Sequence, residues 1–248
     1  MKLVVTSFFM AWGMFWIVPC PVKWWDERGR VGMLLFLPVV GLMIGLVWAI
    51  CVWLRERYLP GPLGAALVSV IPYIFSGFIH LDGYMDCSDA VLSRRDLETR
   101  RKILKDSHVG SFAVVALVIL FLLEFAAFSG ESLESKVWLL PFVCAVPRSC
   151  SVCAVSFFKP IPGSSYEKMF SNGVPASART CAVLTTILLI LIPVFLFGYA
   201  GCSAAVGAAA SFLTIIYIRH DLQGMSGDVS GAGITVGELC ALAALTIL

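Results

Sequence analysis

Long runs with almost no charged residue dominate this sequence and limit what it can fold into. They cover about residues 3–20, 31–54, 62–81, 110–129, 137–158, 181–200, 203–218 and 233–248. Only 14% of the residues are charged, 59% are hydrophobic and the mean hydropathy is +0.91, which excludes a soluble domain. Since about 20 apolar residues form a membrane-crossing helix, the sequence predicts an all-α, polytopic integral membrane bundle with about seven transmembrane helices, within a range of about six to eight.

The first apolar run, residues 3–20, is ambiguous. It follows a basic residue as in a signal peptide, but it ends in Val18-Pro19-Cys20-Pro21, without the small residues of a cleavage site. We therefore expect it to be retained, either spanning the bilayer or lying in the interface. The other runs and their short loops use the whole chain, so we expect one membrane-embedded domain over residues 1–248.

Lys and Arg are distributed unevenly between the loops. The segments 20–30, 80–109, 159–180 and 219–232 carry 13 of the 18 basic residues. Basic residues concentrate on the cytoplasmic side of membrane proteins, so we expect these segments to face the cytoplasm. This arrangement places Lys2 on the opposite side and Arg148 inside a span.

Three aspartates, Asp82, Asp86 and Asp89, follow the third apolar run. On a helix, positions i, i+4 and i+7 lie within about 60° of one another, so the three carboxylates share a face. Convergent carboxylates repel one another unless a cation neutralises them. Mg²⁺ suits these oxygens and completes its coordination with water and phosphate, which predicts a substrate containing phosphate. A solvated helix end and the site of a cation-coupled transporter remain open alternatives.

Two further polar segments lie in loops that we expect to face the cytoplasm. A basic stretch ends in Lys105-Asp106-Ser107, just before a new span, and offers groups that stabilise phosphate charge; anchoring to anionic lipids is the alternative. Residues 224–233 contain four glycines, which favours irregular backbone lining a cavity. Asp228 in this segment is a fourth candidate carboxylate, unless the segment is a plain loop.

Charged residues inside apolar runs are functional candidates by default. Arg148 either clamps a phosphate group or pairs with an acid. Glu124 and Glu238 fit structural roles better.

Three motifs occur in order along the chain: His80-Leu-Asp82-Gly-x-x-Asp86-x-x-Asp89, Arg100-x-x-x-x-Lys105-Asp106-Ser107-x-x-Gly110 and Ser226-Gly227-Asp228-Val-x-Gly231-Ala. Together they resemble the cobalamin synthase family, the adenosylcobinamide-GDP ribazoletransferases, over the whole chain. The departures are His108 in place of arginine, Ser226 in place of threonine, and Ile17 in place of arginine. None of them affects the carboxylates.

The resemblance implies the last assembly step of cobalamin, catalysed with Mg²⁺ in the cytoplasmic membrane of a prokaryote. The 3′-hydroxyl of α-ribazole, or of its 5′-phosphate, attacks adenosylcobinamide-GDP and GMP leaves. Asp89 or Asp106 would accept the hydroxyl proton. The expected partners are these small molecules and the bilayer, with no nucleic acid, and a homo-oligomer is left open.

The resemblance and the residue chemistry together assign three roles. The expected catalytic residues are Asp82, Asp86, Asp89, Lys105 and Asp106. The expected metal ligands are Asp82, Asp86, Asp89 and Asp228. The expected substrate contacts are His80, Arg100, Ser107, Arg148, Ser226 and Gly227.

Two other classes of protein fit part of the pattern. CDP-alcohol phosphotransferases also bind metal through clustered aspartates, but they continue Asp-Gly-x-x-Ala-Arg and carry a second aspartate pair that this chain lacks. An ion-coupled transporter explains buried acids but not Lys105-Asp106-Ser107. Release of GMP, of CMP or of no nucleotide separates the three classes.

Overall fold

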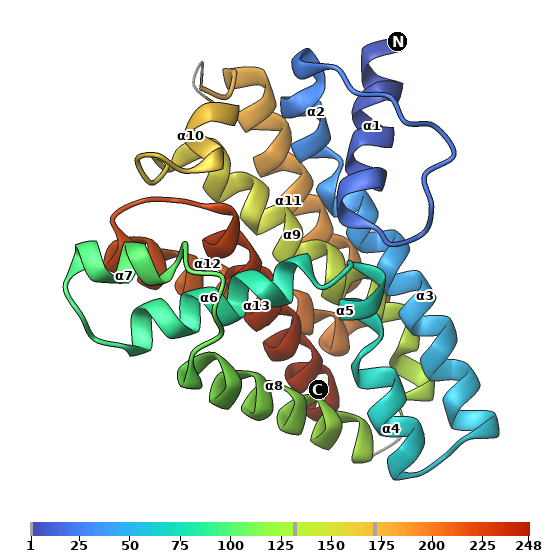
Figure 1. The fold of residues 1–248 in the computed structure, drawn as a ribbon. Helices are drawn as coiled ribbons and strands as arrows, with labels where there is room; N and C mark the ends of the chain where they lie inside the picture. The colour runs from blue at the N-terminus through green and yellow to red at the C-terminus, as the bar shows by residue number, and fades with distance from the viewer. Residues whose placement is uncertain (1, 131–132, 171–172) are drawn as a thin grey trace.

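The computed structural model describes residues 2–130, 133–170 and 173–248, and within these residues the chain is helical with no β-strand (Figure 1). An isolated bridge joins Pro160 to Met225. This confirms the predicted all-α class. The α-helices are α1 Lys2–Phe15, α2 Arg30–Leu35, α3 Leu37–Tyr58, α4 Pro62–Ser69, α5 Ile71–Phe75, α6 Ile79–Leu92, α7 Leu97–Ile103, α8 Ser111–Ser129, α9 Leu140–Phe157, α10 Ser165–Met169, α11 Ala176–Phe197, α12 Cys202–Leu222 and α13 Gly227–Ile247, and the 3₁₀ helices are η1 Glu27–Gly29, η2 Glu134–Leu139 and η3 Gly198–Gly201.

Fewer helices can cross a membrane than the sequence predicts. Among the described residues, five helical stretches are long and apolar enough, and a sixth is added if the bent pair Pro62–Phe75 and Ile79–Leu92 forms one span. One of the five, Ala176–Leu222, is 47 residues long and contains both α11 and α12. These two helices fold back on each other at Gly198, where φ is 57°, and pack in a shared apolar cluster.

Helix α9 forms the centre of the bundle (Figure 1). It packs against α3, α11, α12 and α13, and 89% of the apolar window in Glu134–Phe157 is buried. In contrast, only 22% of the window in Ala176–Leu222 is buried. The apolar outer surface suits lipid, because acyl chains impose no cost on exposed apolar side chains.

Helix α1 does not cross the bundle. It has 14 residues, whereas a span needs about 20. Its first half lies beside η1, with Ser7 Oγ donating to the Gly29 carbonyl at 3.1 Å, and the amide of Ile17 donates to the Phe75 carbonyl at 2.8 Å. Among the described residues α1 is therefore a shorter apolar helix and is not one of the candidate spans. Lys2 lies at the end of the bundle that holds α2, not at the opposite end (Figure 1).

The predicted span over residues 62–81 is broken. Its helices meet at an angle of 94°, and the break holds two residues with positive φ, Gly77 at 64° and Phe78 at 61°. Glycine adopts such angles without strain, so Ser76-Gly77 ends α5 and redirects the chain. As a result, α6 runs across the bundle and carries the first aspartates toward α13 (Figure 1).

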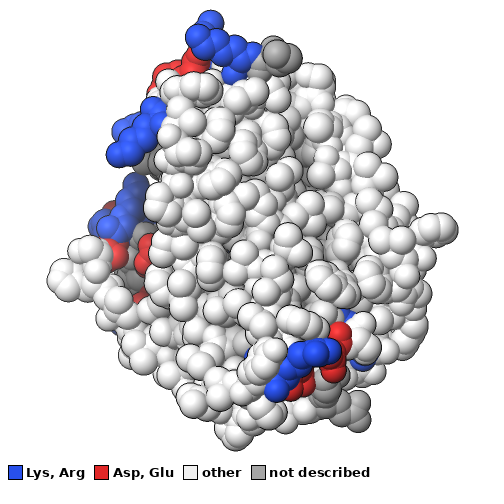
Figure 2. All heavy atoms as spheres, turned by 90° about the vertical axis from the view of Figure 1, so that its right-hand side faces the viewer, with Lys and Arg blue, Asp and Glu red and all other residues white. Residues whose placement is uncertain are grey.

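Charged side chains are confined to the edges of the face in Figure 2. Lys, Arg, Asp and Glu gather along its upper and left edges and in one group near the bottom, and a broad uncharged surface separates them. Such a band is typical of a surface in contact with the hydrocarbon core of a bilayer.

Candidate functional site

Two motifs far apart in the sequence meet where α6 crosses α13. A Cβ atom on Gly83 would lie 2.8 Å from the Cα of Asp228, and one on Gly231 would lie 2.7 Å from the carbonyl oxygen of His80. Only glycine permits this approach of the two backbones. The crossing brings Asp82 on α6 close to Asp228 on α13, as the sequence predicted.

A cavity of about 230 Å³ opens at this crossing. Asp82 and Asp228 both line it, together with His80, Ser230 and Tyr166. The remaining wall comes mainly from apolar side chains of α1, α2, α3, α10 and α13 and from Phe170, which follows α10. The helix residues are Met14, Phe15, Met33, Leu34, Leu37, Met169 and Ile234. The cavity therefore combines a carboxylate pair with an apolar chamber.

The aspartates of this crossing have acidic neighbours. Asp82, Asp228 and Asp89 all act electrostatically on Asp86. The salt bridges found among the described residues involve neither Asp82, Asp86 nor Asp228. Like charges held together in this way favour binding of a cation.

No three His, Cys, Asp or Glu side chains converge tightly enough, in the described part of the chain, to hold a metal ion by themselves. Mg²⁺ usually takes one or two carboxylates and obtains its other ligands from water and phosphate. The shared cavity of Asp82 and Asp228 fits this mode of binding.

Asp89, an expected metal ligand, has hydrogen-bond partners on both carboxylate oxygens. Its Oδ2 accepts a hydrogen bond from the amide of Gly110 at 2.6 Å, and its Oδ1 accepts one from the amide of Ala113 at 2.9 Å. These are otherwise unpaired donors at the start of α8, so the carboxylate caps that helix. Asp89 thereby joins α6 to α8, and both its oxygens are engaged.

The glycine-rich segment 224–233 is mostly helical, which corrects the expectation of irregular backbone. Helix α13 begins at Gly227, and Ser226 is its N-cap, accepting from the amide of Val229 at 3.3 Å. The Ser226 hydroxyl also donates to Asp228 Oδ2 at 3.1 Å. Gly227 lines the cavity. The glycines serve close helix packing, and Ser226 orients a site carboxylate.

Two arginines of the basic motif contact residues at the end of α12. Arg100 forms an ion pair with Asp221, and Arg101 donates to the carbonyls of Leu222 and Gln223 at 3.0 and 3.1 Å. These contacts hold α7 against the C-terminal end of α12, where cations are favourable. The expected substrate contact Arg100 is therefore engaged within the protein.

The segment Lys105-Asp106-Ser107 lies on the surface. Lys105 Nζ is 3.6 Å from the position that a Cβ on Gly163 would take, and Ser107 is exposed. Asp106 accepts from the amide of His108 at 3.0 Å and contacts its ring Nδ1 at 2.7 Å. The hydrogen bond from His108 holds the pKa of Asp106 below its usual value.

Arg148 does not line the cavity and lies in the core of the bundle. It is fully buried, forms an ion pair with Glu238 and donates to the carbonyl of Cys144 at 2.7 Å. Nearby, the hydroxyl of Tyr73 donates to Glu124. Of the two alternatives for Arg148, the structure shows pairing with an acid.

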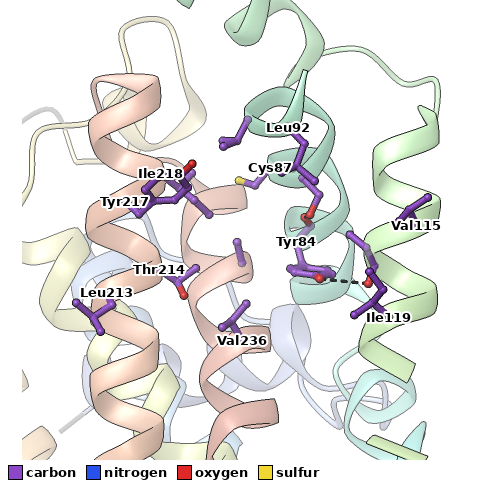
Figure 3. A pocket seen from close by; sticks show the side chains of 14 residues that line it. Tyr84, Cys87, Leu92, Val115, Ile119, Leu213, Thr214, Tyr217, Ile218 and Val236 are labelled. Carbon is purple, nitrogen blue, oxygen red and sulfur yellow. Dashed lines mark hydrogen bonds between the residues drawn. The ribbon is translucent and has the colours of Figure 1, made fainter. Parts of the chain in front are cut away.

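A larger cavity of about 510 Å³ lies on the other side of α6. Tyr84, Cys87 and Leu92 face Tyr217 and Ile218 of α12 across it, and Tyr84 donates to the Ala116 carbonyl at 3.2 Å (Figure 3). At 100° per residue Tyr84 lies about 160° around α6 from Asp82 and Asp86, so it is opposite these carboxylates, whereas Leu92 is only about 80° from Asp82. Because no ionisable acid or base other than tyrosine and cysteine lines it, this cavity is not the candidate active site.

Several wall residues of the smaller cavity were missed by the sequence reasoning, among them Tyr166 and Phe170. They belong to the segment after α9, which carries one local signal. Ser164 Oγ accepts from the amide of Glu167 at 3.2 Å, and Glu167 accepts from the amide of Gly163 at 2.6 Å. This Ser-x-x-Glu pattern predicts a helix start, and so could have revealed α10.

Comparison with known proteins agrees with the motifs. The model of the cobalamin-5-phosphate synthase family matches residues 7–246. Curated relatives named adenosylcobinamide-GDP ribazoletransferase include one from Clostridium perfringens, 34% identical over 100% of both chains, and one from Clostridium botulinum, 33% identical over 98% of this chain and 97% of the relative. A relative of the same name from Methanosarcina barkeri is 25% identical over 100% of this chain and 94% of its own. No solved structure matches. The chain belongs to the cobalamin-5-phosphate synthase family.

Proposed function

We propose that this enzyme transfers the adenosylcobinamide phosphate of adenosylcobinamide-GDP to the 3′-hydroxyl of α-ribazole or of α-ribazole 5′-phosphate. The products are adenosylcobalamin or its 5′-phosphate, and GMP. One observation carries the proposal: Asp82 and Asp228 share the wall of a single cavity, and neither is in a salt bridge among the described residues. The names of the curated relatives support the choice of substrates.

In this reaction the chain's own residues position the charge and the reactants. Asp82 and Asp228 would hold Mg²⁺, with Asp86 beside them. When bound, Mg²⁺ offsets the negative charge of the diphosphate and of the departing GMP. Ser226 keeps the Asp228 carboxylate in place through its hydrogen bond, and the cap from Asp89 fixes the position of α6 relative to α8.

The transfer forms a bond between the 3′-oxygen and the cobinamide-side phosphorus, and breaks the bond between that phosphorus and the oxygen that leaves with GMP. The hydroxyl proton needs an acceptor. Both oxygens of Asp89 are engaged, and the lowered pKa of Asp106 makes it a weak base. Asp86 is the carboxylate that remains for this step.

We infer that the site faces the cytoplasm of a prokaryotic cell. The positive-inside rule supports this orientation, because α7, α10 and η1 carry Lys and Arg at the end of the bundle that holds the cavity (Figure 1).

A direct assay tests the proposal. Purified protein in detergent is incubated with adenosylcobinamide-GDP, α-ribazole and Mg²⁺, and GMP is measured. We expect GMP release that stops on addition of EDTA and is absent from the Asp82→Ala protein. Full activity of that variant would overturn the site. Release of CMP from a CDP-alcohol favours the phosphotransferase alternative, and absence of any nucleotide release favours transport.

A further inference from the structure

We propose that a third cavity, of about 290 Å³, binds the 5′-phosphate of α-ribazole 5′-phosphate through Lys159 and Arg179. We call it the basic cavity. This inference rests on the proposed function and specifies how the enzyme distinguishes its two acceptors. Three features of the structure support it: the cations in the wall, the helix end beside them, and the position of the cavity next to the candidate active site.

The wall of the basic cavity carries two cations, and no acid is among the described residues that line it. Lys159 follows α9, and Arg179 belongs to α11. Neither is in a salt bridge among the described residues. The Arg179 guanidinium lies over the ring of Phe157, 5.6 Å from its centroid, and Phe157 lines the same cavity. Two cations without an ion-pair partner on one cavity favour an anion, and phosphate oxygens accept from guanidinium and ammonium groups alike.

The N-terminal end of α11 adds positive charge at the same place. Val174 lines the basic cavity just before this helix, and Arg179 is the fourth residue of the helix. The first amides of an α-helix have no partner within the helix. The N-cap residue Pro175 offers no side-chain acceptor, and the first turn contains no acid. A cation near the positive end of a helix is unfavourable, whereas an anion is favourable. An anion bound between Lys159 and Arg179 would compensate the cations and the helix end together.

The basic cavity adjoins the candidate active site. Tyr166 and Phe170 line both cavities, and their rings form an edge-to-face pair with centroids 5.7 Å apart. The backbone of Lys159 is also joined to the segment that leads into α13, because its carbonyl accepts from the amide of Met225 at 2.9 Å. Met225 lines the basic cavity and lies three residues before Asp228. The cations are therefore held next to the carboxylate site by shared wall residues and by a backbone hydrogen bond.

Only one phosphate group of the proposed reactants is away from the reacting bond. Both phosphates of adenosylcobinamide-GDP belong to the diphosphate, which Asp82 and Asp228 would hold through Mg²⁺. The 5′-phosphate of the acceptor takes no part in the transfer and is separated from the 3′-hydroxyl by the ribose. Beside the carboxylates it would meet like charge, whereas the adjoining basic cavity offers two cations. The 5′-phosphate is therefore the group that this cavity suits.

The variants Arg179→Gln and Lys159→Gln test the inference, because α-ribazole and its 5′-phosphate differ only in the group that these cations would bind. GMP release is measured with each acceptor in turn. We expect the KM for α-ribazole 5′-phosphate to rise about tenfold or more in each variant, the usual effect of losing a hydrogen bond to a charged group. The KM for α-ribazole should stay unchanged. Lys168→Gln is the matched control, since it removes an exposed cation of α10 that lines neither of the two adjoining cavities, and it should change neither KM.

Equilibrium dialysis without Mg²⁺ and without adenosylcobinamide-GDP measures binding independently of turnover. The wild type should bind α-ribazole 5′-phosphate about tenfold or more tightly than α-ribazole, and the double variant should bind both equally. Dialysis also separates this inference from the proposed function. Binding that depends on the phosphate and on both cations, without GMP release, would contradict the reaction and not the phosphate site. GMP release with equal KM values for the two acceptors would contradict the phosphate site and not the reaction.

Two further results would overturn the inference: equal changes of the KM for both acceptors, or a change confined to the KM for adenosylcobinamide-GDP. Lipid headgroups are the other source of phosphate at a membrane surface. If the cations bound them instead, phosphatidylglycerol in nanodiscs would raise the unfolding temperature of the wild type and not of the double variant, and the variants would not change the KM for either acceptor. If Arg179→Gln does not fold, Lys159→Gln provides the same test, because its side chain is exposed.

Discussion

Two sets of acids in this protein differ in burial and in partners. In the core, Glu238 pairs with Arg148 and Glu124 accepts from Tyr73. At the crossing of α6 and α13, Asp82 is exposed and Asp228 is half-buried; both line a cavity, and neither is in any salt bridge of the described chain. The difference shows that burial alone does not mark a functional acid.

The two sets of acids have different electrostatic environments, because only the core acids are buried. A buried charge is costly unless a partner compensates it. The core acids obtain compensation from the protein, so their contribution is to the fold. The cavity acids are open to solvent and have no salt-bridge partner among the described residues, as the proposed binding of a cation and substrate requires.

The largest effect should follow from neutralising a cavity acid. Asp82→Asn and Asp228→Asn keep the side-chain size but remove the charge, so GMP release should fall by about a thousandfold or more, of the order seen when key electrostatic groups are removed. Thermal unfolding in detergent should change little, because neither acid is in a salt bridge of the described chain and the asparagine of Asp228→Asn can still accept from Ser226 through its amide oxygen. Glu124→Gln is the matched control, since it can still accept from Tyr73, and it should retain activity.

The core pair should respond in the opposite way. Glu238→Gln leaves the guanidinium of Arg148 buried without a counter-charge, and we expect a loss of about 3–5 kcal/mol in stability. The double variant Arg148→Met with Glu238→Leu should regain most of it, because apolar replacement of a buried ion pair is often neutral. Thermal unfolding measures both changes. A stable, folded and inactive Glu238→Gln protein would instead place this pair in the reaction.

The close crossing of α6 and α13 places Asp82 near Asp228. One added methyl group at this crossing should push the two helices apart. Gly83→Ala places a Cβ about 2.8 Å from the Cα and 2.9 Å from the carbonyl oxygen of Asp228, which are backbone atoms that cannot turn away. We expect about 1–3 kcal/mol of destabilisation and up to about a hundredfold lower turnover from misplaced carboxylates. Gly77→Ala is a control at an open position, with no atom within 4 Å, although its φ of 64° adds strain. Equal activity of Gly83→Ala and the wild type would show that the crossing does not position the site.

The sequence predicts the helical class and the meeting of the main motifs. Run lengths identify membrane helices because hydrocarbon thickness sets a minimum apolar length. The polar motifs on α6 and α13 are both expected to face the cytoplasm, and the structure places Asp82 and Asp228 in the wall of one cavity. The same reasoning does not predict that Asp89, which shares the helix face of Asp82, accepts hydrogen bonds from amides at the start of α8. Helical periodicity predicts the face of the helix on which a side chain lies, but not which group of another helix contacts it.

The cavity wall was beyond prediction for a related reason. Phe15 belongs to α1, whose apolar run resembles a span, and Phe170 follows the five-residue helix α10. Their positions depend on how the chain turns back after residue 15 and after α9. Such turns arise from tertiary contacts, like the hydrogen bond from Ile17 to Phe75, which leave no periodic pattern in the sequence.

The smallest effect should follow from changing Asp106, an exposed acid that does not line the cavity. Asp106→Asn should lower turnover by no more than about threefold, as expected for an exposed ionic contact. His108→Asn sharpens the test, because losing the ring contact should raise the pKa of Asp106 toward its usual value. If Asp106 accepted the proton, the acidic limb of the kcat profile would move to higher pH in this variant, since a base must be deprotonated to act. We expect that limb to stay in place. A shifted limb, together with a large loss of kcat in Asp106→Asn at unchanged KM, would transfer the role of base from Asp86 to Asp106.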